Sequence, residues 1–151
     1  MIHVSRKVTL PADLSVARVR DIAKATMKKA ANAGDFSIIF TDDKEIQQLN
    51  RDYRHIDSPT DVLAFNSDEI DPMTNTLYLG DVIISVERAE KQAHLAANHI
   101  SDELTMLIVH GCLHLAGLDH TTDPEKEKMR VSQEAILVSL GVKNSSWPRE
   151  E

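Results

Sequence analysis

The chain has 151 residues, of which 42% are hydrophobic and 27% are charged, and its formal net charge is −7. This length suits one domain with a substantial hydrophobic core, and the acidic balance does not favour a general nucleic-acid-binding protein. Apolar stretches fall short of the roughly 20 residues that span a bilayer, and no signal-peptide pattern follows Met1. A single cysteine excludes an internal disulfide and fits a reducing compartment. We therefore expect a cytoplasmic protein without a membrane partner.

The first third of the chain predicts a strand, a helix and a second strand. Residues 2–10 alternate polar and apolar side chains up to Pro11, as in a strand with one buried face. Residues 15–32 place apolar side chains at helical spacing, and Gly34 is expected to end that helix. Residues 36–40 are β-branched and aromatic, which is typical of a short strand.

The first 33 residues are basic although the whole chain is acidic. They contain seven Lys or Arg and two Asp. This segment is either a solvated basic helix face or a track for a phosphate backbone. The pattern alone favours the solvated face.

The next segment predicts a helix, a loop and a strand. Asp42 and Glu45 form a capping-box pattern that opens a helix running to about Tyr53. The polar residues 55–60 then form a loop that leads into a strand over 61–65.

A loop, a strand and a helix are expected to follow. Residues 66–76 contain acids, Pro72 and two Asn, and they are expected to be a loop. Residues 77–84 predict a strand, after which Ser85 caps a helix over about 86–97.

Two further helices complete the predicted fold. One covers about 101–116, and the other begins at Asp123-Pro124 and ends near Gly141. The polar tail from about 143 is expected to be frayed, apart from Trp147. We therefore predict a single α+β domain over residues 1–151, with a mixed sheet of about four strands packed against about five helices.

Three histidines, His110, His114 and His120, have the spacing of a metal-binding helix followed by a turn. Residues four apart lie on one face of an α-helix, so His110 and His114 point in the same direction. Gly117 can take the left-handed conformation that ends a helix, and the reversed chain then brings His120 to the pair. Three imidazoles with an open fourth position are typical of a catalytic zinc site, and we expect one Zn²⁺ per chain.

The same segment matches the zinc-protease signature His-Glu-x-x-His-x-x-Gly-x-x-His at every fixed position but one. Gly111 stands where the protease has the Glu that serves as general base. The segment therefore predicts a metal site with chemistry other than peptide hydrolysis. Cys112 lies about 200° around the helix from His110, so we expect a small core residue there and not a ligand.

A second group of polar residues surrounds Arg54, between a helix and a strand. A guanidinium presents a planar fork that fits a phosphate, so Arg54 is a candidate for stabilising charge on a phosphorus centre. Spacing alone favours the alternative that Arg54 bridges Asp57 or Asp61 and only secures the loop. Asp81 and Asp119 compete for another role, that of holding the second ring nitrogen of a metal-bound histidine.

Three motifs follow one another along the chain: LNRDYR at 49–54 with DSPTDVLAF at 57–65, LGDVIIS at 79–85, and HGCLHLAGLDH at 110–120. Together they resemble the YbeY family, the bacterial zinc-dependent endoribonucleases of ribosomal RNA maturation. The chain differs from the usual family pattern at Ala64, Asn66 and Leu118, none of which is a predicted ligand.

The resemblance implies that His110, His114 and His120 hold zinc and that Arg54 takes part in catalysis or RNA contact. The candidate catalytic residues are therefore Arg54 and His110. The resemblance also implies cleavage of single-stranded RNA at the 3′ end of small-subunit ribosomal RNA and a role in ribosome quality control. The implied partners are the small ribosomal subunit, one of its proteins and a ribosome-assembly GTPase.

Two other functions stay open at the level of the sequence. A zinc metallopeptidase or another zinc hydrolase fits the near-match to the protease signature, although Gly111 argues against it. A non-catalytic ribosome-assembly factor with structural zinc would lose its fold, and not an activity, when His114 is replaced. Imidazole also suits nickel, copper and iron, so zinc is inferred from geometry and from the resemblance.

Overall fold

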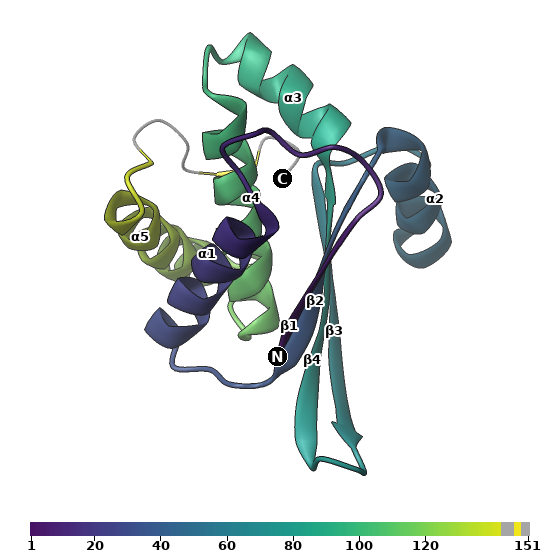
Figure 1. The fold of residues 1–151 in the computed structure, drawn as a ribbon, viewed down its shortest axis with the longest axis vertical. Helices are drawn as coiled ribbons and strands as arrows, with labels where there is room; N and C mark the ends of the chain where they lie inside the picture. The colour runs from purple at the N-terminus through teal and green to yellow at the C-terminus, as the bar shows by residue number, and fades with distance from the viewer. Residues whose placement is uncertain (143–146, 149–151) are drawn as a thin grey trace.

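The computed structural model describes residues 1–142 and 147–148, which form one four-stranded sheet with helices on both faces (Figure 1). The strands are β1 (Ile2–Arg6), β2 (Asp35–Thr41), β3 (Val62–Asp71) and β4 (Thr76–Ser85). The helices are α1 (Val16–Lys29), α2 (Asp43–Arg54), α3 (Val86–Leu95), α4 (Ile100–Leu115) and α5 (Asp123–Ser139).

The strand order in the sheet is β1-β2-β4-β3. β2 pairs in parallel with β1 and with β4, while the edge strand β3 runs antiparallel to β4. The predicted α+β fold with a four-stranded mixed sheet and five helices is therefore confirmed for the described residues. Apart from Trp147 and Pro148, the tail expected to fray from about 143 lies outside them.

The main core lies between one face of the sheet and α1, α3, α4 and α5, whereas α2 covers the opposite face (Figure 1). Helix α4 is the centre of this core, because its residues 103–113 are buried without interruption. A helix that is apolar around its whole circumference needs such an enclosed position. A smaller cluster of Ile46, Leu63 and Ile83 holds α2 to the sheet.

Helix α2 begins where the capping pattern predicts. The Asp42 carboxylate accepts a hydrogen bond from the Glu45 amide at 2.9 Å. The Glu45 side chain does not complete the reciprocal half of the box, because it accepts from the Lys7 ammonium at 2.7 Å. This ion pair ties the start of α2 to the segment that follows β1.

Two boundaries near the N-terminus differ from the predictions. The first strand ends at Arg6 and not at residue 10, because the chain leaves the sheet so that Leu10 packs into the main core. The first helix ends at Lys29 and not at Gly34, and Ala31 adopts a left-handed conformation (φ 52°) just after its end. The first difference follows from the burial of Leu10, which overrides the local pattern.

The prediction of a loop over 66–76 is wrong. β3 continues to Asp71 and β4 begins at Thr76, so only four residues form the turn of a long hairpin that extends past the other strands (Figure 1). Acids, Asn and Pro disfavour a strand locally, but cross-strand pairing with β4 decides the conformation. Pro72 lies in the turn, where its missing amide hydrogen has no sheet partner to lose.

No helix among residues 1–142 and 147–148 combines the length and apolar character that a membrane crossing requires.

Candidate metal centre

The C-terminal half of α4 carries the two histidines of the predicted helical pair. His110 is fully buried and His114 is half-buried in the last turn. Gly117 follows with φ 101°, and the Leu118 amide donates to the Leu113 carbonyl at 3.0 Å, a helix-ending bond. The predicted chain reversal at Gly117 is therefore confirmed, and it returns His120 toward the pair.

His110, His114 and His120 meet in space. Their candidate ligand atoms all lie within 4.8 Å of one another. The ring centroids of His114 lie 4.8 Å from those of His110 and 4.9 Å from those of His120. Three neutral imidazoles at this spacing are a donor set that fits a divalent transition-metal ion.

Gln133 of α5 orients the buried histidine. His110 Nδ1 lies 2.8 Å from Gln133 Oε1, and both side chains are fully buried. Because an amide oxygen only accepts, the bond places the imidazole proton on Nδ1, and Nε2 is then the nitrogen that can donate its lone pair to a metal. The signal in the sequence is a single amide in the buried stripe of α5, four residues after Met129 and three before Ile136.

The two carboxylates proposed from the sequence do not fill this role. The Asp81 carboxylate accepts from the Tyr78 hydroxyl at 2.5 Å, and Asp119 accepts from the backbone amide of His120 at 2.7 Å. Asp119 therefore shapes the turn before the third histidine. Burial, together with the bond to Asp81, raises the pKa of the Tyr78 hydroxyl.

The contact between α4 and the sheet leaves room only for glycine at position 111. A Cβ at this position would lie 2.4 Å from Val82 Cγ1 on β4. The helix backbone therefore rests directly on the strand, and a Glu at position 111 does not fit there. The side chain of Val82 occupies the space that a general-base Glu at position 111 would need.

Arg54 lies exposed at the C-terminal end of α2. Within the described residues, its guanidinium makes no hydrogen bond or ion pair, and Asp57 is bound by Gln47 instead. The loop-securing ion pair that spacing favoured is thus not present. The guanidinium is free to meet an anionic ligand.

The edge strand β3 links the Arg54 segment with the metal helix. The ring of Tyr53 packs edge-on against Phe65, with the centroids 5.3 Å apart. The next residue, Asn66, donates from Nδ2 to the His114 carbonyl at 3.2 Å. The segment before Arg54 and the last turn of α4 therefore flank the same point of β3.

Trp147 is the second site residue, after Gln133, that sequence reasoning did not assign. Its ring lies edge-on to His110 and His120, with centroid distances of 4.8 and 5.6 Å. Lys126 places its ammonium 5.5 Å from the centre of the same ring. No local pattern predicts this contact, because Trp147 lies 27 positions after His120 along the chain.

Cys112 is a core residue, as its place on the helix predicts. Its side chain is fully buried, and burial raises the pKa of the thiol. A neutral, enclosed thiol is a poor metal ligand and a poor nucleophile.

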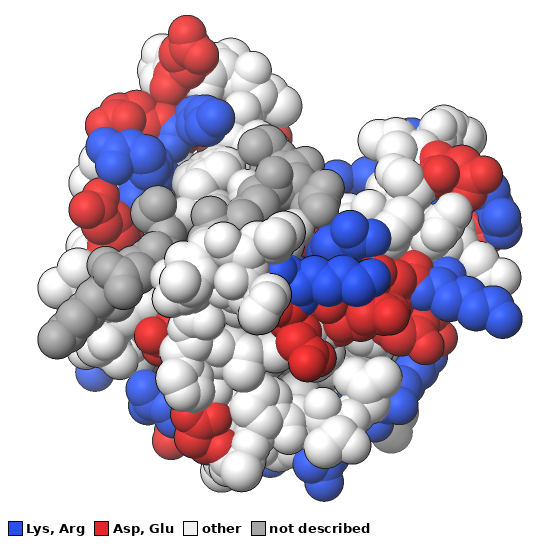
Figure 2. All heavy atoms as spheres, turned by 90° about the horizontal axis from the view of Figure 1, so that it is seen from above, with Lys and Arg blue, Asp and Glu red and all other residues white. Residues whose placement is uncertain are grey.

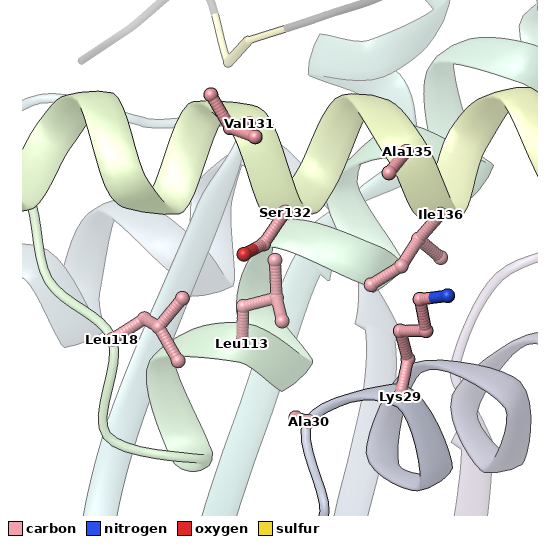
Figure 3. A pocket seen from close by; sticks show the side chains of 8 residues that line it. All are labelled: Lys29, Ala30, Leu113, Leu118, Val131, Ser132, Ala135 and Ile136. Atoms are coloured by element: carbon pink, nitrogen blue, oxygen red, sulfur yellow. The ribbon is translucent and has the colours of Figure 1, made fainter.

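A separate cavity of about 260 Å³ lies behind the metal helix (Figure 3). Leu113 and Leu118 line it from α4 and the following loop, and residues of α5 and the end of α1 close the other sides. Its lining is mainly apolar and includes none of the three histidines. The cavity therefore belongs to the packing between helices.

Charged side chains of both signs are mixed on the face that Figure 2 shows, and they do not form a surface of one sign. Between α2 and α3, Asp43 pairs with two cations. Its carboxylate lies 3.1 Å from Arg88 and 3.5 Å from Lys91.

Comparisons with known proteins identify the family of the chain. Residues 4–141 match the family model described as "Endoribonuclease YbeY". An endoribonuclease YbeY of Desulfitobacterium hafniense (strain Y51) is 45% identical over 128 residues, covering 80% of this chain and 82% of its own. One from Halalkalibacterium halodurans is 42% identical over 126 residues, covering 78% and 79%.

A solved structure is similar over almost the whole fold. The solution structure of a Thermotoga maritima protein aligns with a TM-score of 0.61 at 25% sequence identity, covering 93% of this chain and 92% of its own. The fold and the histidine cluster thus define an α+β protein with a candidate metal site on its central helix. The chain belongs to the YbeY family of endoribonucleases.

Proposed function

We propose that this protein is a zinc-dependent endoribonuclease that cleaves single-stranded RNA, with His110, His114 and His120 as the metal ligands. The observation that carries the proposal is the meeting of these three imidazoles within 4.8 Å in a chain of this family. Residues 1–151 act as one nuclease domain. His110 and Arg54 are the proposed catalytic residues.

A zinc ion held by the three histidines would polarise a phosphoryl oxygen and lower the pKa of a water molecule. The chain's own residues do the remaining work. Gln133 keeps the proton of His110 on Nδ1, so that this ring stays a neutral donor. Arg54 neutralises the charge that develops on the phosphate oxygens as the phosphodiester is attacked.

The chain supplies no carboxylate at the position of the protease general base, since residue 111 is Gly and packs on Val82. Without that carboxylate, either activation of the water by the metal alone suffices, or a chain of water molecules or the RNA's own 2′-hydroxyl takes part in moving the proton. Gly111 therefore argues against peptide hydrolysis, despite the near-match to the protease signature.

We further propose that the substrate is ribosomal RNA, at the 3′ end of the small-subunit molecule, and that the protein contributes to ribosome quality control. The proposed partners are the small ribosomal subunit, one of its proteins and a ribosome-assembly GTPase, all in the cytoplasm. The family membership supports this assignment, and single-stranded RNA is the substrate flexible enough to bend its backbone toward a half-buried histidine site.

The test compares wild type with His114→Ala and with a matched control, His94→Ala, which changes an exposed histidine on α3. Metal content, far-ultraviolet circular dichroism and cleavage of one RNA in single-stranded and duplex form are measured on proteins purified side by side. We expect His114→Ala to lose metal and cleavage while it stays folded, and His94→Ala to match wild type.

Two outcomes would contradict the proposal. If His114→Ala cleaves the RNA as fast as wild type, the activity comes from elsewhere. If His114→Ala unfolds and wild type cleaves no RNA, the site is structural, as in a non-catalytic assembly factor.

A further inference from the structure

The exposed face of helix α1 carries much of the basic charge that distinguishes the first 33 residues from the rest of the chain. Five cations lie on this helix, and all of them are exposed: Arg18, Arg20, Lys24, Lys28 and Lys29. Asp21 is the one acid on α1. The opposite face of the helix packs into the main core, so the cations project into solvent from a fixed support.

Bonds within the protein account for little of this charge. Arg20 donates from Nε to the Ile2 carbonyl at 3.2 Å. Within the described residues, the side chains of the other four cations of α1 make no hydrogen bond or ion pair. By contrast, the Lys7 ammonium in the same basic segment lies 2.7 Å from the Glu45 carboxylate. Four positive charges of α1 are therefore available to a ligand.

The stability of the helix does not explain the charge either. The N-terminal end of a helix is partially positive, so acids in the first turn stabilise it and cations do not. Among the helices of the described residues, α2, α3, α4 and α5 each have an acid in the first turn, and α1 has none. Arg18 occupies the third helical position of α1, where a capping box has Glu or Gln.

The exposed face of α1 fits a phosphate backbone better than it fits a protein or a membrane. None of the large apolar side chains that the structure exposes belongs to α1. The centre of a protein interface is typically apolar, and a membrane-surface helix must have its apolar face free to insert. A phosphate backbone requires only cations, and Arg18 to Lys28 extend over about 15 Å of helix, enough for several phosphates.

The C-terminal end of α1 adjoins the loop that carries the third histidine. Lys29 and Leu118 line the same cavity, and Leu118 is two residues before His120 (Figure 3). Helix α1 and helix α2 cover opposite faces of the sheet, so the cations of α1 form a surface separate from Arg54 (Figure 1). A strand that leaves the histidines along this loop meets the end of α1.

We propose that the exposed face of α1 is an electrostatic contact surface for the phosphate backbone of single-stranded RNA, outside the metal centre. Lys24 and Lys28 lie about one helical turn apart, opposite the buried face, and each of them meets a phosphate. For RNA as the ligand, this inference rests on the proposed function. The binding itself needs neither metal nor cleavage, because these cations hold the strand away from the histidines.

The test measures how RNA affinity depends on salt. Fluorescently labelled single-stranded oligouridine is titrated with the full chain at several potassium chloride concentrations, and a chelator prevents cleavage. For single strands, each phosphate contact contributes about 0.7 to the slope of log affinity against log salt. We expect Lys24→Gln/Lys28→Gln to reduce this slope by about 1.4 relative to wild type, with an unchanged thermal midpoint.

Lys44→Gln/Lys91→Gln is the matched control, because it removes two exposed cations from α2 and α3 and gives the same net charge. Its slope should equal that of wild type. If both double variants reduce the slope equally, net charge alone governs binding and the inference is overturned. A wild-type slope in Lys24→Gln/Lys28→Gln overturns it as well.

Arg18→Glu separates binding from stability. Glu at this position completes the capping box and suits the positive end of the helix, so the thermal midpoint should rise. The affinity for oligouridine should fall in the same variant, because a phosphate contact is replaced by a repelling charge. A higher midpoint with undiminished affinity would contradict the proposed surface.

Vesicles that contain phosphatidylserine distinguish RNA from a membrane as the partner. We expect the wild type not to bind them at the salt concentration at which it binds oligouridine. Vesicle binding that depends on Lys24 and Lys28, with an RNA slope that does not, would assign the surface to a membrane and overturn the inference.

A cleavage assay on the metal-loaded wild type separates this inference from the proposed nuclease. If the slope changes as expected but the wild type cleaves no RNA, the contact surface is supported and the nuclease function is contradicted. If the wild type cleaves RNA and the slope does not change in Lys24→Gln/Lys28→Gln, the nuclease stands and the contact surface falls.

Discussion

His110 Nδ1 lies 2.8 Å from Gln133 Oε1, and this bond joins the metal helix α4 to α5 inside the core. It decides which ring nitrogen of His110 is available to a metal. Because neither side chain reaches solvent, no water can replace the lost partner at low cost when one of them is changed.

Replacing Gln133 by Leu should weaken metal binding while the fold persists. Leu fills a similar buried volume but offers no acceptor, so the proton of His110 is no longer held on Nδ1. Loss of such a partner typically costs about 10–100-fold in metal affinity. A competition titration with a chelator measures this affinity, with the exposed Gln48→Leu on α2 as control. Equal affinities in both variants would contradict the orienting role of Gln133.

Replacing Gly111 by Ala should destabilise the protein, although Ala favours helices. The new Cβ would lie 2.4 Å from Val82 Cγ1, and overpacking of a buried contact costs about 1–3 kcal/mol. Urea unfolding measures the loss. The double variant Gly111→Ala/Val82→Ala should be more stable than the sum of the two single effects predicts. Strict additivity would show that the contact does not limit position 111.

Replacing Arg54 by Ala should lower the rate constant for RNA cleavage by about a hundredfold, the effect of losing one group that stabilises transition-state charge. Metal content and stability should not change, because the side chain is exposed and makes no bond among the described residues. Arg51→Ala is the matched control, since Arg51 is an exposed arginine of the same helix that pairs with Asp52 at 3.4 Å. The role fails if Arg54→Ala and Arg51→Ala cleave equally fast.

The Tyr78 hydroxyl should ionise at a higher pH than a free tyrosine, because burial and then the bond to Asp81 raise its pKa above 10.0. The folded state keeps the neutral phenol, so this group's contribution to stability is complete below pH 10 and is lost as the pH rises further. In a Tyr53→Phe background Tyr78 is the single tyrosine, and phenolate absorbance reports it directly. Asp81→Asn should lower its pKa, and an unchanged titration would contradict the assignment.

The metal centre was predictable because its three histidines lie within eleven residues, where helix geometry and one glycine determine their relation. Gln133 and Trp147 were not assigned, since α5 and the tail reach the site only through tertiary packing. Gly111 was recognised as the missing base, but its contact with Val82 depends on how closely α4 approaches β4. Ligand roles for the histidines and a catalytic role for Arg54 stay predictions.

The fold was predictable wherever periodicity and caps agreed, as at Asp42 and Ser85, whose side chains accept bonds from the helices they precede. It was mispredicted over 66–76, where composition favoured a loop. Strand pairing depends on two segments together. Ile70 lies opposite Leu77 in the hairpin, but neither residue by itself indicates that pairing in the sequence.

The outer half of the β3–β4 hairpin has no neighbouring strand beyond the pairing of Asp35 with Tyr78. Its tip exposes Met73 at 90%, so it carries none of the core that supports the histidines. The turn between Asp71 and Thr76 is therefore a natural place for grafting an affinity tag or a fluorophore. Such an attachment would report on the protein in a larger assembly without disturbing its metal chemistry.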